Sequence, residues 1–352
     1  MSLTAIMLLL SLSAAPTETA STEEHPACEQ CGGGRSRQLG GHTFLFPMLQ
    51  RSAFVASYVG SNQGVAWYDV PDLPIGQLGT QDVSLVGYQQ ALDLGLRLTP
   101  WLGLWGEARG TLYTGLTVGS FVSDGANFRA SGVGGAVVRL LHLDSSGTQL
   151  SLRAGGGYEG GTEIALLPLL NAIVDTPGVT LVSILRGNLG ELLTVKISET
   201  SVNGGLFFAQ ALGGSFLGLQ ASASAVHLWR TRKPFDPTVD ARVEQESTAI
   251  RFNLAAALTA DFKSLGVPLA LMGEYLFTAG SQSETELART DLRSSSVALG
   301  LYYTGRPNLQ LGLGGVAVLN SEPRIGRDAD GNPAASGEPS LFYGQLVLRY
   351  IW

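Results

Sequence analysis

Apolar and polar residues alternate along most of the chain in short runs. In "ALDLGLRLTP", residues 91–100, the four leucines fall on one face of an extended strand, and Asp93 and Arg97 fall on the other, because successive side chains of a strand point to opposite sides. The same alternation recurs in "QLSLRAGGGYEG" (149–160), "AIRFNLAAALTA" (249–260), "PLALMGEYLFTAG" (268–280) and "NLQLGLGGVAVLN" (308–320). Each run predicts a strand with one apolar and one polar face.

The runs are roughly 9 to 13 residues long, which is the length that a tilted strand needs to cross a membrane. Their predicted starts lie near Arg51, Ser84, Trp101, Phe128, Thr148, Leu192, Phe216, Thr248, Val267, Ser294, Asn308 and Ser340. Short turns alternate with longer connections over residues 60–83, 114–127, 160–191, 229–247, 280–293 and 320–339. The predicted fold is therefore all-β: a transmembrane antiparallel up-and-down β-barrel of about 12 strands, with short periplasmic turns and long extracellular loops.

Aromatic residues should collect at both ends of such strands. On the turn side we expect Trp101, turned inward by the pleat, together with Tyr350 and Trp352. On the loop side we expect Tyr58 and Phe342 among others. The barrel is assigned to residues 51–352.

Composition supports a membrane protein without spanning helices. Only 14% of the 352 residues are charged, against about a quarter in average soluble proteins. No stretch reaches the roughly 18 uninterrupted apolar residues of a transmembrane helix. The net charge of −7 provides no basic surface for nucleic acid, so no nucleic-acid partner is expected.

The N-terminus predicts export. "LTAIMLLLSLSAA" is apolar and too short to span a membrane, and Ser13 and Ala15 have the small side chains that precede a cleavage site, so residues 1–15 are predicted to be a signal peptide. The alternative is a buried N-terminal helix. Residues 16–50 are predicted to form a flexible periplasmic segment. Cys28 and Cys31 within it are expected to form a local disulfide rather than a metal site, since a closed site wants four ligands.

The chain ends on "SLFYGQLVLRYIW", whose apolar face carries aromatic residues at both ends. This run resembles the closing strand of Gram-negative outer-membrane β-barrels, which typically ends in an aromatic residue and is read by the barrel-assembly machinery. The resemblance is to the porin-like class and to no specific family. It implies an outer-membrane location in contact with outer-membrane lipid, with the N-terminal segment in the periplasm.

The polar strand faces provide the candidate site. The residues predicted to line the pore are Asp93, Arg97, Glu107, Arg109, Arg129, Arg139, Arg153, Glu159, Arg251, Glu274 and Arg349. An excess of arginine over acid inside a narrow barrel favours anions. The alternative is that these charges pair across the lumen and fill it.

These patterns favour a passive channel for small solutes, anions among them, with no cofactor, no metal and no enzymatic chemistry. One alternative is a barrel for hydrophobic solutes, suggested by the apolar loop 160–191, and another is a closed barrel serving as anchor or adhesin. An outer-membrane hydrolase is the remaining alternative, in which His227 would need a nucleophile other than Ser222 and Ser224, because these serines lie on the opposite strand face. A lipid-facing stripe of small residues also leaves room for a second copy and hence a homo-oligomer: Ala130, Gly132, Gly134 and Ala136.

Overall fold

The computed structural model of the chain describes residues 36–75, 79–117, 120–121, 125–164, 194–212, 216–236, 241–284, 287–321, 323–328 and 332–352. All of them belong to the larger of two compact units, Gly33–Trp352. The predicted signal peptide, the Cys28–Cys31 disulfide and most of the apolar loop 160–191 lie outside the described residues.

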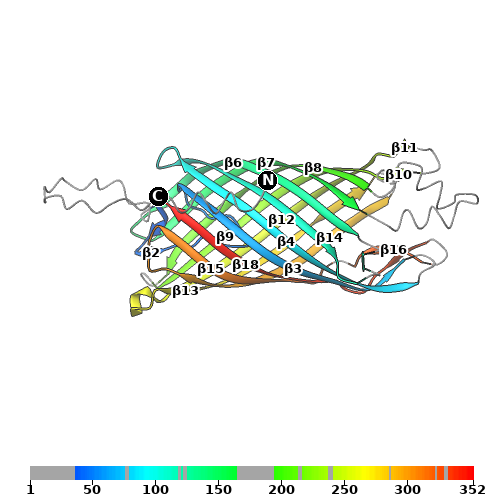
Figure 1. The fold of residues 1–352 in the computed structure, drawn as a ribbon. Helices are drawn as coiled ribbons and strands as arrows, with labels where there is room; N and C mark the ends of the chain where they lie inside the picture. Colours follow the sequence, from blue (N-terminus) through cyan, green and yellow to red (C-terminus); the bar gives the residue numbers. More distant parts are fainter. Residues whose placement is uncertain are drawn as a thin grey trace, which may run out of the picture. The chain divides into compact units, whose positions relative to one another are not determined.

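Twelve strands close into one antiparallel barrel (Figure 1). They are β3 (Tyr58–Pro74), β4 (Thr80–Arg97), β5 (Leu102–Gly115), β6 (Ala126–Leu143), β7 (Thr148–Ile164), β8 (Thr194–Leu212), β9 (Leu217–Lys233), β12 (Gln245–Asp261), β13 (Leu269–Glu284), β14 (Leu287–Tyr303), β15 (Leu309–Leu319) and β18 (Ser340–Ile351). Each strand pairs with its neighbours in the chain, and β18 pairs with β3 to close the ring. The prediction of an all-β, up-and-down barrel is confirmed.

The two ends of the barrel differ. At the turn end, short connections follow β4, β6, β12 and β14, and the third of these contains the 3-10 turn η3 (Phe262–Leu265). At the loop end, two longer connections form small ladders, β10 (Phe235–Asp236) with β11 (Ala241–Arg242), and β16 (Ile325–Arg327) with β17 (Pro333–Ala335). None of the helical segments among the described residues is long and apolar enough to cross a membrane.

The strands are longer than the sequence pattern predicts. They run from 11 residues in β15 to 19 in β8, so that most of the predicted loop 60–83 is strand. A strand of 17 residues tilted by about 40° rises roughly 40 Å, well beyond an apolar band of about 25 Å. The part outside the lipid needs no apolar face, and the alternation that marks a strand in the sequence fades there.

The outer surface is mostly apolar, with aromatic residues at both ends. Tyr350 and Trp352 stack at the turn end with ring centroids 6.1 Å apart, and Trp67 and Phe342 stack nearer the loop end at 6.0 Å. Trp101 lies just before β5 and is 54% exposed, so the pleat of β5 does not bury it as the inward assignment expects.

Residues 36–57, here called the lumen segment, precede β3 and lie inside the turn half of the barrel. They include the short ladder of β1 (Gln38–Leu39) and β2 (His42–Thr43). Phe44, Leu45 and Phe54 are at most 1% exposed. The prediction of a flexible segment over residues 16–50 is therefore wrong for residues 36–50, because their apolar side chains and backbone groups find partners in the lumen.

The first barrel strand therefore starts later in the chain than predicted. β3 begins at Tyr58 rather than near Arg51. Tyr58 consequently lies at the turn end, pairs with Ile351 and points inward, where it is 4% exposed. Its expected place among the outer aromatic residues of the loop end is wrong for this reason.

Candidate functional site

All eleven residues that the sequence assigns to the lumen lie on inward strand faces, as judged from the alternation of buried and exposed positions and the strand register. They do not all lie in the same part of the lumen. Six of them line a large cavity: Asp93, Glu107, Arg109, Arg129, Arg153 and Arg349. Glu159 pairs with Arg129, Glu274 binds the lumen segment, Arg97 and Arg139 lie near the turn end, and Arg251 lies on β12.

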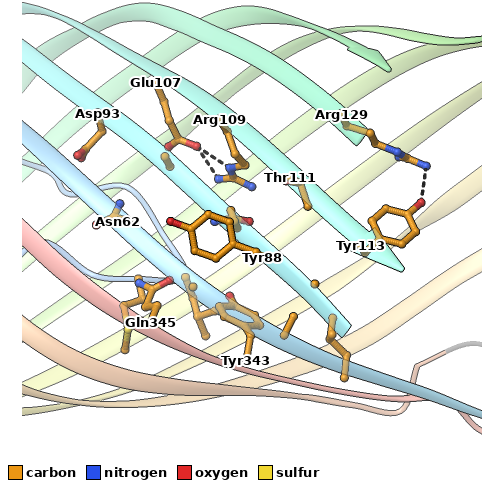
Figure 2. A pocket seen from close by; sticks show the side chains of 18 of the residues that line it. Asn62, Tyr88, Asp93, Glu107, Arg109, Thr111, Tyr113, Arg129, Tyr343 and Gln345 are labelled. Carbon is orange, nitrogen blue, oxygen red and sulfur yellow. Dashed lines mark hydrogen bonds and ion pairs between the residues drawn. The ribbon is translucent and has the colours of Figure 1, made fainter. Parts of the chain in front are cut away.

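The cavity occupies the lumen between the lumen segment and the loop end (Figure 2) and has a volume of about 800 Å³. Its lining contains eight arginines and three carboxylates. The arginines are Arg51, Arg109, Arg129, Arg153, Arg230, Arg232, Arg324 and Arg349, and the acids are Asp93, Glu107 and Glu163. Residues 46–52 of the lumen segment form its floor.

One charge cluster joins this floor to the wall. The Arg51 guanidinium of the lumen segment donates to Glu107 of β5 at 2.7 Å, and Arg109 donates to the other carboxylate oxygen at 2.5 Å. Figure 2 shows the contact between Glu107 and Arg109. The Arg51 guanidinium also lies 4.7 Å from the Trp105 ring centroid. One glutamate thus neutralises two arginines only in part.

A second cluster lies closer to the loop end. Arg129 of β6 donates to Glu163 at 2.8 Å and to Glu159 at 3.2 Å. Its guanidinium also donates to the Tyr113 hydroxyl at 3.3 Å (Figure 2). Glu163 accepts a further bond from Arg232 of β9 at 2.8 Å. Here the charges pair across strands, as the filling alternative expects.

A buried ion pair marks the boundary between cavity and lumen segment. Arg349 of β18 donates to one oxygen of Asp93 on β4 through Nη2 at 2.5 Å and Nε at 3.1 Å. The two residues are 5% and 2% exposed. The guanidinium also lies 4.6 Å from the Phe46 ring centroid and 5.2 Å from that of Tyr58. The pair therefore ties the closing strand, β4 and the lumen segment together.

The backbone of the lumen segment is bound by side chains from the wall. Gln310 of β15 donates to the Phe46 carbonyl at 3.1 Å and accepts the Phe46 N–H at 3.0 Å. Glu274 of β13 accepts the N–H groups of Met48 and Leu49, each at 2.8 Å. These side chains satisfy peptide groups that have no sheet partner, which burial would otherwise make costly.

The opposite wall holds the returning part of the segment. From β7, Gln149 and Ser151 donate to the Ala53 carbonyl at 2.7 and 2.5 Å, and Arg153 donates to the Ser52 carbonyl at 2.8 Å. Arg153 is 3% exposed, and its recorded bonds go to carbonyl oxygens rather than to a carboxylate. Arginine retained without a carboxylate partner adds to the positive character of the lumen.

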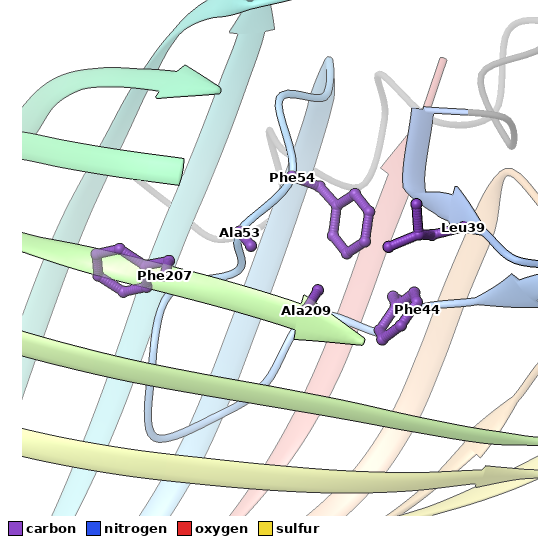
Figure 3. Close-up of a cluster of buried hydrophobic side chains, with 6 residues drawn as sticks. All are labelled: Leu39, Phe44, Ala53, Phe54, Phe207 and Ala209. Atoms are coloured by element: carbon purple, nitrogen blue, oxygen red, sulfur yellow. The ribbon is translucent and has the colours of Figure 1, made fainter. Parts of the chain in front are cut away.

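Apolar contacts complete the packing of the lumen segment. One cluster is drawn in Figure 3 and consists of Leu39, Phe44, Ala53, Phe54, Phe207 and Ala209. Leu45 packs in a second cluster with Met272 and Tyr302, and its carbonyl accepts a bond from Gln220 of β9 at 2.7 Å. The lumen segment is thus packed as a core element inside the barrel.

Arg37 fixes the entry of the segment at the turn end. It is 2% exposed and donates to the carbonyls of Phe44 at 3.0 Å and Pro307 at 2.7 Å. Burial, followed by the nearby charge of Arg349, lowers the pKa of Arg37 to about 10. The side chain therefore stays protonated at neutral pH and keeps both bonds.

Some lumen residues were missed because the sequence pattern placed them in loops or in the flexible segment. Arg230 and Arg232 fall in the predicted loop 229–247, yet β9 continues to Lys233. Their shared parity with the inward Ser222 and Ser224 was the signal that could have found them. Arg230 pairs with Glu199 of β8 at 2.6 Å. Arg51 was assigned to the first strand rather than to the lumen segment.

The residues weighed for a hydrolase do not meet. His227 lies on the outward face of β9, where its ring stacks on Trp229 with centroids 4.1 Å apart. Ser222 and Ser224 point inward, where they line a smaller cavity of about 230 Å³. Within the described ranges, no group of three or more His, Cys, Asp or Glu side chains could hold a metal ion.

Comparison with known proteins bears on the fold. No family model matches the chain, and no curated protein matches it. Its structure is similar to the translocator domain of autotransporter NalP from Neisseria meningitidis, with a TM-score of 0.51 and 8% sequence identity over 84% of this chain and 88% of that one. An outer-membrane channel from Pseudomonas putida F1 gives a TM-score of 0.49 and 14% identity over 88% of this chain and 100% of that one. The predicted class, Gram-negative outer-membrane β-barrels, is confirmed at the level of the fold.

Proposed function

We propose that this outer-membrane barrel is a passive channel for small anionic solutes, which collect in the cavity and pass when the lumen segment leaves the turn half. The observation that carries the proposal is the cavity lining, with eight arginines against three carboxylates. Guanidinium groups bind carboxylate and phosphate oxygens through paired N–H donors. Rings of such side chains select anions in pores.

The ion pairs in the cavity wall reduce the excess of positive charge but do not cancel it. Arg129 is bound by two glutamates, whereas Arg51 and Arg109 share one and Arg153 binds carbonyl oxygens. A solute anion near Glu107 would therefore meet more positive than negative charge. Because the lumen has a low dielectric compared with bulk water, that excess acts over several ångströms.

The lumen segment sets the direction of access. It forms the floor of the cavity, so solutes reach the site from the loop end, which we place outside the cell. Passage to the turn end, which we place in the periplasm, requires the segment to move. We propose no catalytic role and no cofactor.

A closed barrel serving as an anchor is the second candidate, favoured by one observation. The lumen segment is held by buried bonds from β7, β9, β13 and β15, which would suit a permanent stopper. A hydrophobic-solute barrel is less well supported, because the described part of the cavity wall is rich in charge.

Planar-bilayer recordings in a salt gradient test the proposal. The protein should pass current with a reversal potential that favours anions. The double variant Arg109→Gln and Arg232→Gln should shift that potential toward zero, because it removes two charges from the cavity wall. The matched control is Arg306→Gln in the turn between β14 and β15, which removes one charge outside the cavity and should change nothing.

Two results would contradict the proposal. Current that favours cations in the wild type would show that the arginine excess does not control the pore. An absence of current both in the wild type and in a variant lacking residues 38–50 would favour the anchor.

A further inference from the structure

A polar cluster lies on the lipid-facing side of the barrel, midway between the two aromatic ends. On the outward faces of β3 and β18 the paired residues are, in order, Trp67 with Phe342, Val65 with Gly344, Gln63 with Leu346, Ser61 with Leu348 and Val59 with Tyr350. Gln63 is thus four residues from each end of this apolar column. At about 3.3 Å per residue and a tilt of about 40°, it lies roughly 10 Å below the aromatic belt, within the hydrocarbon.

The neighbouring strand adds to this cluster. Gln90 of β4 is the register partner of Gln63. The Gln90 carboxamide donates to the Ser61 hydroxyl at 2.9 Å and accepts a bond from the Tyr88 hydroxyl at 3.1 Å. Among the described residues, no hydrogen bond reaches the carboxamide of Gln63, which is exposed. Gln90 is satisfied locally, and Gln63 is not.

Lipid chains cannot satisfy Gln63. An amide placed in hydrocarbon without a hydrogen-bond partner costs several kcal/mol, and polar residues in the membrane usually face a partner rather than lipid. Elsewhere on this surface the exposed positions at similar depth are aliphatic, such as Leu92, Leu254 and Leu299. The position of Gln63 therefore points to a protein partner.

The outward side chains near Gln63 on β5 and β6 are small, which leaves room for the backbone of a neighbouring protein. Next to β4, the outward residues of β5 and β6 include Ala108, Gly110, Ala130 and Gly132. A Cβ added at Gly110 or Gly132 would meet nothing within 4 Å. Small side chains let backbones of two membrane segments approach, as they do between helices.

We propose that this face binds a second copy of the chain in the membrane, related by a two-fold axis along the membrane normal and passing close to Gln63. The carboxamide fits such a partner because it carries both a donor and an acceptor, so two copies facing each other exchange two hydrogen bonds. A two-fold contact uses the same patch on both subunits. The inference does not depend on the proposed channel activity.

Cysteine crosslinking in native outer membranes tests this contact. In a background with Cys28 and Cys31 changed to serine, Val65→Cys should form a dimer with a short bis-maleimide, because Val65 lies two residues from Gln63 on the same outward face of β3 and close to its own copy across the axis. This variant keeps the Gln63 carboxamide. The matched control is Leu299→Cys, which is 59% exposed on β14 on another part of the barrel and should stay monomeric. Equal crosslinking of the two variants, or a Val65→Cys adduct with a different protein, would overturn the proposal.

A second variant separates the polar contact from mere proximity. With Val65→Cys as the crosslinking reporter, adding Gln63→Leu should reduce the dimer fraction by at least about threefold, the effect of one average hydrogen bond between membrane segments. Heat-modifiable migration on gels confirms that each variant is folded. Unchanged crosslinking in folded Gln63→Leu protein would show that the carboxamide does not hold the copies together.

Discussion

The two halves of the lumen use inward polar side chains in different ways. In the turn half, Gln149, Gln220, Glu274 and Gln310 bind the backbone of the lumen segment. In the loop half, arginines and glutamates bind one another around a cavity of about 800 Å³. Carboxamides can both donate to and accept from a peptide group, and in the turn half Glu274 and Arg153 also bind peptide groups. In the loop half, guanidinium and carboxylate groups mostly bind each other, which is the pairing they favour. The same strand alternation thus builds a binding site for the lumen segment in one half and a charged cavity in the other.

Shortening the lumen segment should have the largest effect on conductance. Deletion of residues 38–50 removes most of the lumen segment from the turn half, and single-channel conductance should rise on the order of tenfold or more, because barrels of this size hold a lumen that backbone otherwise fills. Planar-bilayer recording measures it. Unchanged conductance in a folded deletion variant would show that the lumen segment does not limit the path.

The boundary between the halves depends on a buried ion pair. Arg349→Leu leaves Asp93 buried without its partner and should lower the free energy of unfolding by roughly 3–5 kcal/mol. Urea unfolding in vesicles, followed by tryptophan fluorescence, provides the measurement. The double variant with Asp93→Asn should recover most of the loss, and a single variant as stable as the wild type would rule out this role.

Removing a side chain that binds the backbone of the lumen segment should have a smaller effect, which is measured as the frequency of channel openings. Glu274→Ala removes the acceptor of the Met48 and Leu49 N–H groups. Each hydrogen bond contributes about 0.5–1.5 kcal/mol, so the loss of two should make openings in bilayer recordings roughly 5- to 100-fold more frequent. Glu159→Ala, which changes a lumen carboxylate in the loop half, is the control and should leave the opening frequency unchanged. An equal effect of both variants would remove the distinction between the halves.

The smallest effect on channel opening is expected where two side chains bind the same carbonyl of the lumen segment. Ser151→Ala removes one of two donors to the Ala53 carbonyl, and Gln149 still donates at 2.7 Å. The loss should be about 0.5–1.5 kcal/mol, which corresponds to a several-fold increase in openings. A change as large as that of Glu274→Ala would mean that the two bonds do not substitute for each other.

The barrel could be predicted from the sequence because lipid forces each strand to show an apolar outer face. The starts at Thr148 and Ser340 agree with the structure. Where strands leave the lipid this requirement ends, and residues such as Arg230 and Arg232 were assigned to a loop. The inward orientation of Asp93, Glu107 and Arg109 followed from alternation alone.

The lumen segment could not be predicted in this way. Its partners are distant in the chain, and Phe46 and Gln310 are 264 positions apart. No local period marks a segment whose backbone is satisfied by scattered side chains. The apolar letters "FLFPML" at residues 44–49 were the available signal, and they are equally compatible with several kinds of burial.

The most direct test of a movable stopper is a reversible lock. A Cβ at Gly314 of β15 would lie 2.5 Å from the Met48 sulfur, so Met48→Cys with Gly314→Cys should tether the lumen segment to the wall in a background with Cys28 and Cys31 changed to serine. Combined with Glu274→Ala, the oxidised protein should pass almost no current, and reduction should restore the openings. The same current in the oxidised and reduced states would contradict the account, since the segment would then not control the path.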